Sequence, residues 1–265
     1  MTVVSIPPPR KTVKQEVISW GKAIGVALVI WIGLRSYLVE AFRIPSSSME
    51  NTLLVGDFLF VNKAAFGGEL EIPLTGIHFG RLPAYATPRA GDVVVFRSVE
   101  DSTPNLNIVK RLIGGPGDTL EMRAGVLWLN GEPLDEPYVR PGSVPDDAAG
   151  EFSWQREHLV AGVDPATYRP TRETWGPIVV PADHYFMLGD NRDDSYDSRY
   201  WGPLATWRVE ARVAFLYFSY NRDSYRPFPA LREVRWNRLG RGIDGIEDGT
   251  VGATADEAEL SGAAQ

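Results

Sequence analysis

The sequence predicts a mainly β domain of antiparallel sheet, preceded by one N-terminal transmembrane helix. Short runs rich in β-branched and aromatic residues recur after Ile44, and Gly, Pro, Asn and Asp residues bound them. One run contains Asn130-Gly131, a pair that favours a two-residue hairpin turn. Near the N-terminus, residues 23–34 carry no charge, which indicates a helix in an apolar setting. The 265 residues, 44% of them hydrophobic, suffice for one sizeable core.

The composition excludes several classes of protein. A formal net charge of −7 argues against a nucleic-acid partner, because domains that bind DNA or RNA carry basic surfaces. The chain has no cysteine, so thiol catalysis, disulfides and cysteine-ligated metals are impossible. Its three histidines, His78, His158 and His184, lack the spacing of metal ligands. We therefore expect no metal and no cofactor.

Two segments precede the β region. Residues 1–18 are polar and mostly basic where charged, which predicts a short cytoplasmic arm. The uncharged run 23–34 is too short to span a bilayer alone, since a span needs ~20 helical residues. We expect a transmembrane helix over residues 19–41, with Lys22 and Arg35 near its ends. A cleavable signal peptide and a buried amphipathic helix are the alternatives, and the first lacks small residues at a cleavage site.

The β-rich domain is expected over residues 42–237. Its strands are expected in the runs DFLFVNK (57–63), DVVVF (92–96), NIVKRLI (107–113), VLWLNG (126–131), HYFMLGD (184–190) and ARVAFLYFSY (211–220). Residues 139–177 are punctuated by Pro and Gly and lack clear periodicity, which indicates an insertion or cap. Residues 238–265 are mostly acidic where charged, which predicts a disordered tail.

A serine-rich segment, IPSSSMENTLL, follows the expected helix closely. Three serines after Pro45 are typical of a turn or linker, which is one interpretation. The apolar neighbours Met49 and Leu53 favour another, in which an extended apolar peptide is held close to the membrane and beside a serine hydroxyl.

A single lysine lies inside an apolar strand, in the segment NIVKRLIGGPGDTL. Lys110 in an ordinary strand would point to solvent and stay protonated. If it faces inward, burial disfavours the charged form and lowers its pKa from the usual ~10.4. A neutral amine near pH 8 is a competent base for a serine hydroxyl, so this chain could activate a serine without histidine.

A third segment, MLGDNRDDSYDSRYWGPL, is densely charged after an apolar strand. It is either a solvated acidic loop or a polar support for the lysine. In the second interpretation Asp197 and Arg199 form an ion pair and Ser195 places a hydroxyl near the amine of Lys110.

These three segments, together with PRAGDVVVF from Pro88, closely resemble the four sequence blocks of bacterial signal peptidase I, in the same order. The resemblance covers roughly residues 42–220. It implies the mainly β, antiparallel catalytic domain of the signal peptidase I and LexA-like type, and a membrane-bound serine endopeptidase with a Ser-Lys dyad. The implied dyad is Ser48 as nucleophile with Lys110 as base. The backbone N–H of Ser48 and the hydroxyl of Ser46 would form the oxyanion hole, and Ser195, Asp197 and Arg199 would support the site.

The resemblance also implies the substrate and the location. Exported preproteins would bind as an added β-strand and lose their signal peptides after small residues, as in Ala-x-Ala. The enzyme would sit in the bacterial cytoplasmic membrane by one span, with its catalytic domain on the extracytoplasmic side. One departure stands in the nucleophile block, where Asn51 replaces the family's usual proline.

Three alternatives stay open at this point. The chain could be a specialised processing peptidase of the same family with one dedicated substrate. It could be a non-catalytic, membrane-anchored β-domain that binds exported chains. A self-cleaving repressor of the LexA type would need an N-terminal DNA-binding module, where this chain has an apolar segment.

Overall fold

The computed structural model describes residues 12–37, 39–67, 69–72, 77–81, 83–103, 106–139, 150–224 and 228–243. Most of the expected basic arm (1–11), part of the expected insertion (140–149) and most of the expected acidic tail (244–265) lie outside the described residues. The helices are α1 (Val13–Tyr37), α2 (Lys63–Phe66), α3 (Ser198–Trp201) and α4 (Pro229–Arg232), with 3₁₀ turns η1 (Gly150–Glu157), η2 (Thr206–Arg208) and η3 (Trp236–Arg238).

Strands make up most of the body, as the sequence predicts. They are β1 (Val39–Arg43), β2 (Asp57–Asn62), β3 (Glu69–Ile72), β4 (Ile77–Arg81), β5 (Val93–Arg97), β6 (Asn107–Gly114), β7 (Thr119–Arg123), β8 (Val126–Leu129), β9 (Glu132–Pro133), β10 (Trp175–Val179), β11 (His184–Leu188), β12 (Leu204–Ala205) and β13 (Val209–Ser219). A seven-stranded sheet has the order β1-β2-β13-β5-β6-β11-β12, a four-stranded sheet has the order β10-β7-β8-β9, and β3 pairs with β4. The strand pairs described are antiparallel, which confirms the mainly β, antiparallel class.

Each face of the large sheet is covered by its own core, as the sequence of β5 shows. Val93 and Val95 pack into one cluster, while Val94 and Phe96 pack into another on the opposite face. Successive side chains of a strand point to opposite faces, so the apolar run of β5 is what a strand buried on both sides requires. A third cluster fills the space between the four-stranded sheet and the ends of β6 and β11, and Trp175 is its largest member.

The predicted hairpin is confirmed. Asn130 and Gly131 connect β8 to β9 with φ angles of 52° and 86°. Two successive positive φ angles define the hairpin turn that Asn-Gly favours. Asn130 also joins neighbouring turns, because its Nδ2 donates to Asp118 Oδ1 over 2.8 Å and its Oδ1 accepts from Thr119 N over 2.8 Å.

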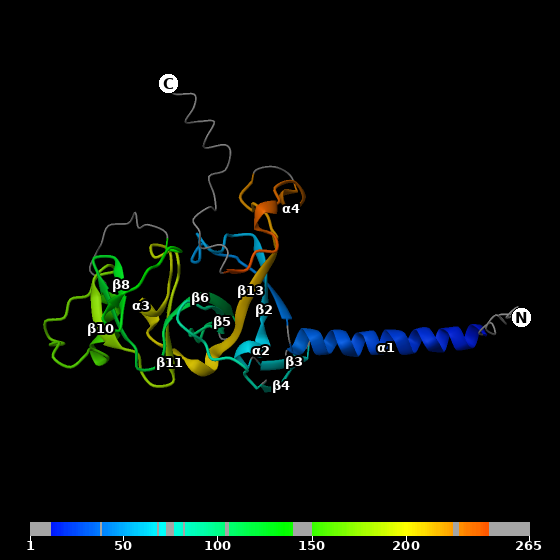
Figure 1. The fold of residues 1–265 in the computed structure, drawn as a ribbon, viewed down its shortest axis with the longest axis horizontal. Coiled ribbons are helices and arrows are strands. Elements are labelled where there is room, and N and C mark those ends of the chain that lie inside the picture. The colour runs from blue at the N-terminus through cyan, green and yellow to red at the C-terminus, as the bar shows by residue number, and fades with distance from the viewer. Residues whose placement is uncertain are drawn as a thin grey trace, which may run out of the picture.

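The N-terminal helix differs from the expected bounds of 19–41. It begins earlier, at Val13, and ends at Tyr37, because residues 39–43 form β1 and pair with β2. Figure 1 shows α1 projecting from the β-rich body as a single rod, so apolar side chains such as Trp20, Ile24 and Val29 are exposed. Within the described ranges, no helix combines the length and the apolar character needed to cross a membrane.

The packed domain extends further toward the C-terminus than residue 237, where the sequence places its end. Arg238 is 1% exposed and Ile243 is 6% exposed, and Ile243 belongs to the same core cluster as Met49 and Leu53. The sequence hides this because η3 is short and charged, and only its contacts with β13 and with the segment before β2 reveal it.

Candidate active site

One cavity of about 600 Å³ contains the serine-rich segment and the strand lysine together. Ser46, Ser48 and Lys110 all line it, although the two serines are more than sixty residues from the lysine in the sequence. Its walls come from residues 42–49, from 98–100 with 106–110, and from Asp194, Tyr196 and Trp201. The structure therefore brings together the three residues that the sequence predicts to perform chemistry.

The segment before β2 forms a tight, internally bonded loop that presents Ser48. Its ends are joined because Ile44 N donates to Asp57 O over 2.9 Å and Gly56 N donates to Ile44 O over 3.1 Å. The loop is also tied to the segment after β11, where Asn191 N donates to Ser48 O over 3.2 Å. Among the described residues, neither the N–H of Ser48 nor the hydroxyl of Ser46 has a hydrogen-bond partner. Both donors remain available to a ligand in the cavity.

Lys110 is buried, not solvent-facing. Its side chain lies on β6 between β5 and β11 and the residue is 3% exposed. The pKa of the Lys110 amine is lowered to about 8, mainly because burial disfavours the charged form; the charge of Asp197 opposes this shift, and the charge of Arg199 adds to it. In the part of the chain that the structure describes, Lys110 Nζ forms no salt bridge and no hydrogen bond. The amine is therefore free to exchange a proton near neutral pH.

The charged segment after β11 supports the lysine as an ordered, buried unit. Arg199 binds Asp197 through two bonds, Nε to Oδ1 over 2.8 Å and Nη2 to Oδ2 over 2.9 Å. Burial alone would raise the pKa of Asp197, but the charge and hydrogen bonds of Arg199 lower it, so this carboxylate stays ionised. Ser195 Oγ is buried and makes no hydrogen bond of normal geometry to another described residue. The solvated-loop interpretation does not describe this segment.

Gly189 marks the place where the three predicted segments meet. Leu188 pairs with Arg111, and continuing this antiparallel register by one residue puts Gly189 beside Lys110. An added Cβ at Gly189 would collide with Ser195 Oγ and would lie 2.5 Å from Ser48 O. The backbone of Gly189 thus lies in direct contact with the Ser48 loop on one side and with Ser195 on the other.

A second group of buried residues was not predicted from the sequence. Asp190 accepts from Arg111 Nε over 2.9 Å and from Arg111 Nη2 over 2.8 Å. It also accepts from Thr52 Oγ1 over 2.5 Å, and Arg111 Nη2 reaches the same hydroxyl over 3.2 Å. Thr52 belongs to the Ser48 loop, so this network joins the loop to β6. An arginine inside the apolar run of β6 was the available signal, since buried arginines need an acidic partner.

The backbone conformation at residue 51 explains why asparagine stands where the resemblance leads one to expect proline. The φ angle of Asn51 is 95°, whereas proline holds φ near −65°, and Asn51 Nδ2 donates to Tyr138 O over 2.9 Å.

We expect Asn51→Pro to lower the free energy of unfolding by about 3 kcal/mol, because the loop backbone must rearrange. Asn51→Gly is the matched control, since glycine tolerates positive φ, and should cost about 1 kcal/mol for the lost hydrogen bond. Denaturant unfolding of both variants measures this, and equal losses would contradict the backbone explanation.

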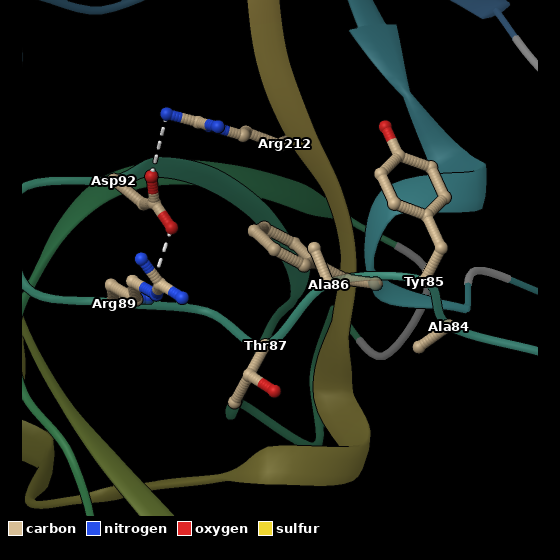
Figure 2. A pocket seen from close by; sticks show the side chains of 8 residues that line it. Ala84, Tyr85, Ala86, Thr87, Arg89, Asp92 and Arg212 are labelled. Atoms are coloured by element: carbon tan, nitrogen blue, oxygen red, sulfur yellow. Dashed lines mark hydrogen bonds and ion pairs between the residues drawn. The ribbon is translucent and has the colours of Figure 1, made fainter.

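A second cavity, of about 610 Å³, contains none of the predicted site residues. It lies between the segment 84–92, α2 and β13, and Figure 2 shows the side chains of Asp92 and Arg212 pointing toward one another. Asp92 accepts from Arg212 Nη2 over 2.9 Å and from the backbone N–H of Arg89 over 2.9 Å. The cavity that holds Ser48 and Lys110 is the candidate active site.

Comparison with known proteins shows the family of the chain. Residues 17–218 match the family described as signal peptidase, peptidase S26. The signal peptidase I of Pseudomonas aeruginosa is 44% identical over 190 residues, which are 69% of this chain and 63% of that protein. That of Pseudomonas fluorescens is 40% identical over 190 residues, with coverages of 69% and 63%. That of Leptolyngbya laminosa is 34% identical over 206 residues, covering 76% of this chain and 79% of that protein.

The matched region spans less than two thirds of the two Pseudomonas proteins. The fold and the site define a β-domain protein whose serine loop and buried lysine share one cavity. The chain belongs to the peptidase S26 family of signal peptidases.

Proposed function

We propose that this chain is a membrane-bound serine endopeptidase that removes N-terminal signal peptides from exported preproteins, with Ser48 as nucleophile and Lys110 as general base. One observation carries the proposal. A buried lysine, whose pKa is lowered to about 8, lines the same cavity as a serine held by a hydrogen-bonded loop. A neutral amine in such a place can accept the proton of a serine hydroxyl at physiological pH.

The reaction proceeds in two half-reactions. Ser48 Oγ attacks the scissile carbonyl carbon, and its proton passes to Lys110 Nζ. The oxyanion accepts hydrogen bonds from the N–H of Ser48 and the hydroxyl of Ser46, two donors that have no described protein partner. The C–N bond then breaks, and the ammonium of Lys110 gives its proton to the leaving amine. Water, deprotonated by Lys110, hydrolyses the acyl-enzyme and releases the signal peptide.

Asp197, Arg199 and Ser195 support this chemistry without reacting. Burial is the main reason that the amine of Lys110 can be neutral. Asp197 alone would favour the charged form, and Arg199 offsets part of that effect. Their paired hydrogen bonds also hold the segment after β11 in one conformation, which positioning of the base requires. The hydroxyl of Ser195 lies beside Gly189 and is available to bind the amine.

The substrate is expected to bind as an extended strand along the cavity, between the segment that ends at Ser46 and the strand that carries Lys110. Main-chain hydrogen bonds of this kind tolerate varied sequences. The apolar lining, which includes Ile44, Leu106 and Trp201, suits the small apolar side chains that precede a signal peptide cleavage site. Cleavage after Ala-x-Ala is therefore the expected specificity.

The proposed location is the bacterial cytoplasmic membrane. The chain would cross it once, in the region of α1, with the β-domain on the extracytoplasmic side. Support comes from the exposed apolar side chains of α1, a helix that Figure 1 shows projecting from the body. Aliphatic and aromatic side chains that are exposed over several helical turns are stabilised by an apolar environment. The proposed partners are therefore the lipid bilayer and the signal peptides of preproteins.

The function is tested with the detergent-solubilised chain and a labelled secretory precursor that contains Ala-x-Ala. We expect cleavage at that site, with one new N-terminus identified by mass spectrometry. Cleavage of one dedicated substrate but of no ordinary precursor would support the specialised peptidase instead. Binding of precursors without any cleavage would support the non-catalytic β-domain.

The rate should depend on the protonation state of Lys110. Because the amine is reactive only when neutral, kcat/KM should rise with pH through an apparent pKa of about 8 and level off above it. Below that pKa the rate should fall about tenfold for each pH unit. An apparent pKa above 10, or a titration of Lys110 by NMR at its ordinary value, would contradict the assignment of the base.

Arg199→Met gives the matched test of the electrostatic argument. Since Arg199 lowers the pKa of Lys110, its loss should move the midpoint of the rate profile to higher pH. Circular dichroism confirms that the variant is folded before its profile is compared. A midpoint that stays in place would mean that Arg199 does not act on the base.

A further inference from the structure

The C-terminal segment, residues 233–243, lies beyond the part of the chain that matches the peptidase family, residues 17–218. It is fixed along β13 by its backbone, with Arg235 N donating to Ser219 O over 2.9 Å and Gly240 N donating to Leu216 O over 2.8 Å. Its one fully buried charged side chain among the described residues is Arg238, at 1% exposure. What Arg238 binds determines what the segment does.

Arg238 binds the loop that carries Ser48 at two points. Its Nη2 donates to Thr52 O over 2.8 Å and to Asp57 Oδ2 over 2.6 Å, and its Nε donates to Asp57 Oδ1 over 3.3 Å. Asp57 is the residue at which the loop ends and β2 begins, and it is 0% exposed. The guanidinium therefore bridges the middle of the loop and its end.

The contact at Thr52 reaches Ser48 through the loop backbone. Thr52 N and Leu53 N both donate to Met49 O, over 3.1 Å and 2.7 Å, and Met49 is the residue after Ser48. The side chain of Thr52 is held on the other side by Asp190 and Arg111, next to Lys110. Thr52 is thus the point at which the loop is held between Arg238 and the strand of the base.

The burial of Arg238 indicates that this side chain positions its partners more than it stabilises the folded state. Removing a guanidinium from water is costly, and apolar residues of similar size often replace a buried ion pair without loss of stability. Arg238 Nη1 is moreover buried without a hydrogen bond to any described residue, so its hydrogen-bonding capacity is incompletely used. A buried, incompletely bonded charge is explained if its other two nitrogens fix a geometry that catalysis needs.

We propose that Arg238 is a positioning residue of the active site, which holds Thr52 and Asp57 so that Ser48 stays within reach of Lys110. This inference rests on the proposed Ser-Lys dyad. It assigns the C-terminal segment a part in the reaction, although the segment does not line the catalytic cavity.

The test compares Arg238→Met with the full-length wild type by two activities. One is cleavage of the labelled precursor. The other is acetylation of Ser48 by 4-nitrophenyl acetate, which is measured by the intact mass of the protein. In this reaction the acetyl carbon bonds to Ser48 Oγ, the hydroxyl proton passes to Lys110 Nζ, and 4-nitrophenolate leaves. We expect kcat and the acetylation rate to fall by about thirtyfold or more with KM changed less than about threefold, because a displaced nucleophile affects the reaction and not binding. Arg123→Met, on the exposed surface of β7, is the control and should match the wild type.

The double variant Asp57→Asn/Arg238→Met separates positioning from stability. In Arg238→Met the Asp57 carboxylate keeps, among the described residues, only the more distant Arg235 Nη1, at 3.8 Å, as a charged partner. Removing that carboxylate charge should restore the thermal midpoint lost in Arg238→Met, whereas kcat should stay low because Thr52 O is still unbound. If Arg238→Met does not fold, Arg238→Lys decides, since it keeps the charge near Asp57 but loses the fork; kcat should fall by about tenfold at a near-native midpoint.

Two results would overturn the inference alone: a variant at position 238 with wild-type kcat, or a double variant whose kcat recovers together with its thermal midpoint. A wild-type chain that neither cleaves precursors nor is acetylated at Ser48 would overturn the proposed dyad, and this inference with it.

Discussion

Ser48→Ala and Lys110→Ala are each expected to lower kcat by about 10⁴-fold or more, because nucleophile and base act as a unit. Alanine at position 48 leaves no oxygen to attack the carbonyl, and alanine at position 110 leaves that oxygen without a proton acceptor. The double variant should be no slower than the single variants, since the second loss removes nothing that still works.

The fold should survive both changes. Lys110 Nζ has no described salt bridge or hydrogen bond, so its removal leaves no charged partner unpaired. Thermal midpoints within about 5 °C of the wild type are expected. Lys63→Ala is the matched control, because Lys63 is also buried but pairs with Glu40 over 3.2 Å outside the cavity. Substantial turnover by folded Lys110→Ala would rule out this lysine as the base.

Gly189→Ala should produce the second largest loss, about 10²-fold in kcat, through a single added methyl group. That carbon would overlap Ser195 Oγ and lie 2.5 Å from Ser48 O, closer than atoms can approach. Either Ser195 or the Ser48 loop must move, and a displacement near 1 Å is enough to disrupt proton transfer to Lys110. The loss should appear in kcat more than in KM, because the substrate groove is left in place.

Gly115→Ala is the matched control for this effect. The nearest atoms to an added Cβ there are Asp118 Oδ2 at 3.8 Å and Tyr185 Cε1 at 4.0 Å, which is ordinary contact. Neither Gly115 nor Gly189 has the positive φ that strains alanine, so the two substitutions differ in space alone. Steady-state kinetics with the precursor compares them. Equal activity of the two variants would mean that the contact at Gly189 is unimportant for catalysis.

Local pattern was sufficient for much of the fold. The expected strands around residues 57–63, 92–96, 107–113 and 184–190 are confirmed because β-branched residues and flanking Gly, Asn and Asp specify strand and turn over a few residues. The strands β7 and β10 were missed. Their sequences are mixed in polarity, and Trp175 and Ile178 became identifiable as core residues only by packing against the other sheet.

The C-terminal end of α1, in contrast, could not be predicted from local sequence. Residues 39–41 contain no Gly or Pro that would end a helix, yet they form β1 because β2 offers an open edge whose backbone groups need partners. The predicted domain boundary at residue 237 is wrong for a related reason. Arg238 is a surface residue by composition, and it is buried only because Asp57, far away in the chain, supplies its counter-charge.

The sequence by itself determined the residue types of the candidate site and their order, since the Ser48, Lys110 and Asp197 segments stand out by pattern and resemblance. Only the tertiary structure decided that Lys110 faces inward, that Arg199 offsets the charge of Asp197, and that Thr52 lies between two buried ion pairs. The physical reason is that a pKa depends on desolvation and on nearby charges in space. Those neighbours come from strands and loops far apart in the chain, and no local pattern specifies which of them will meet.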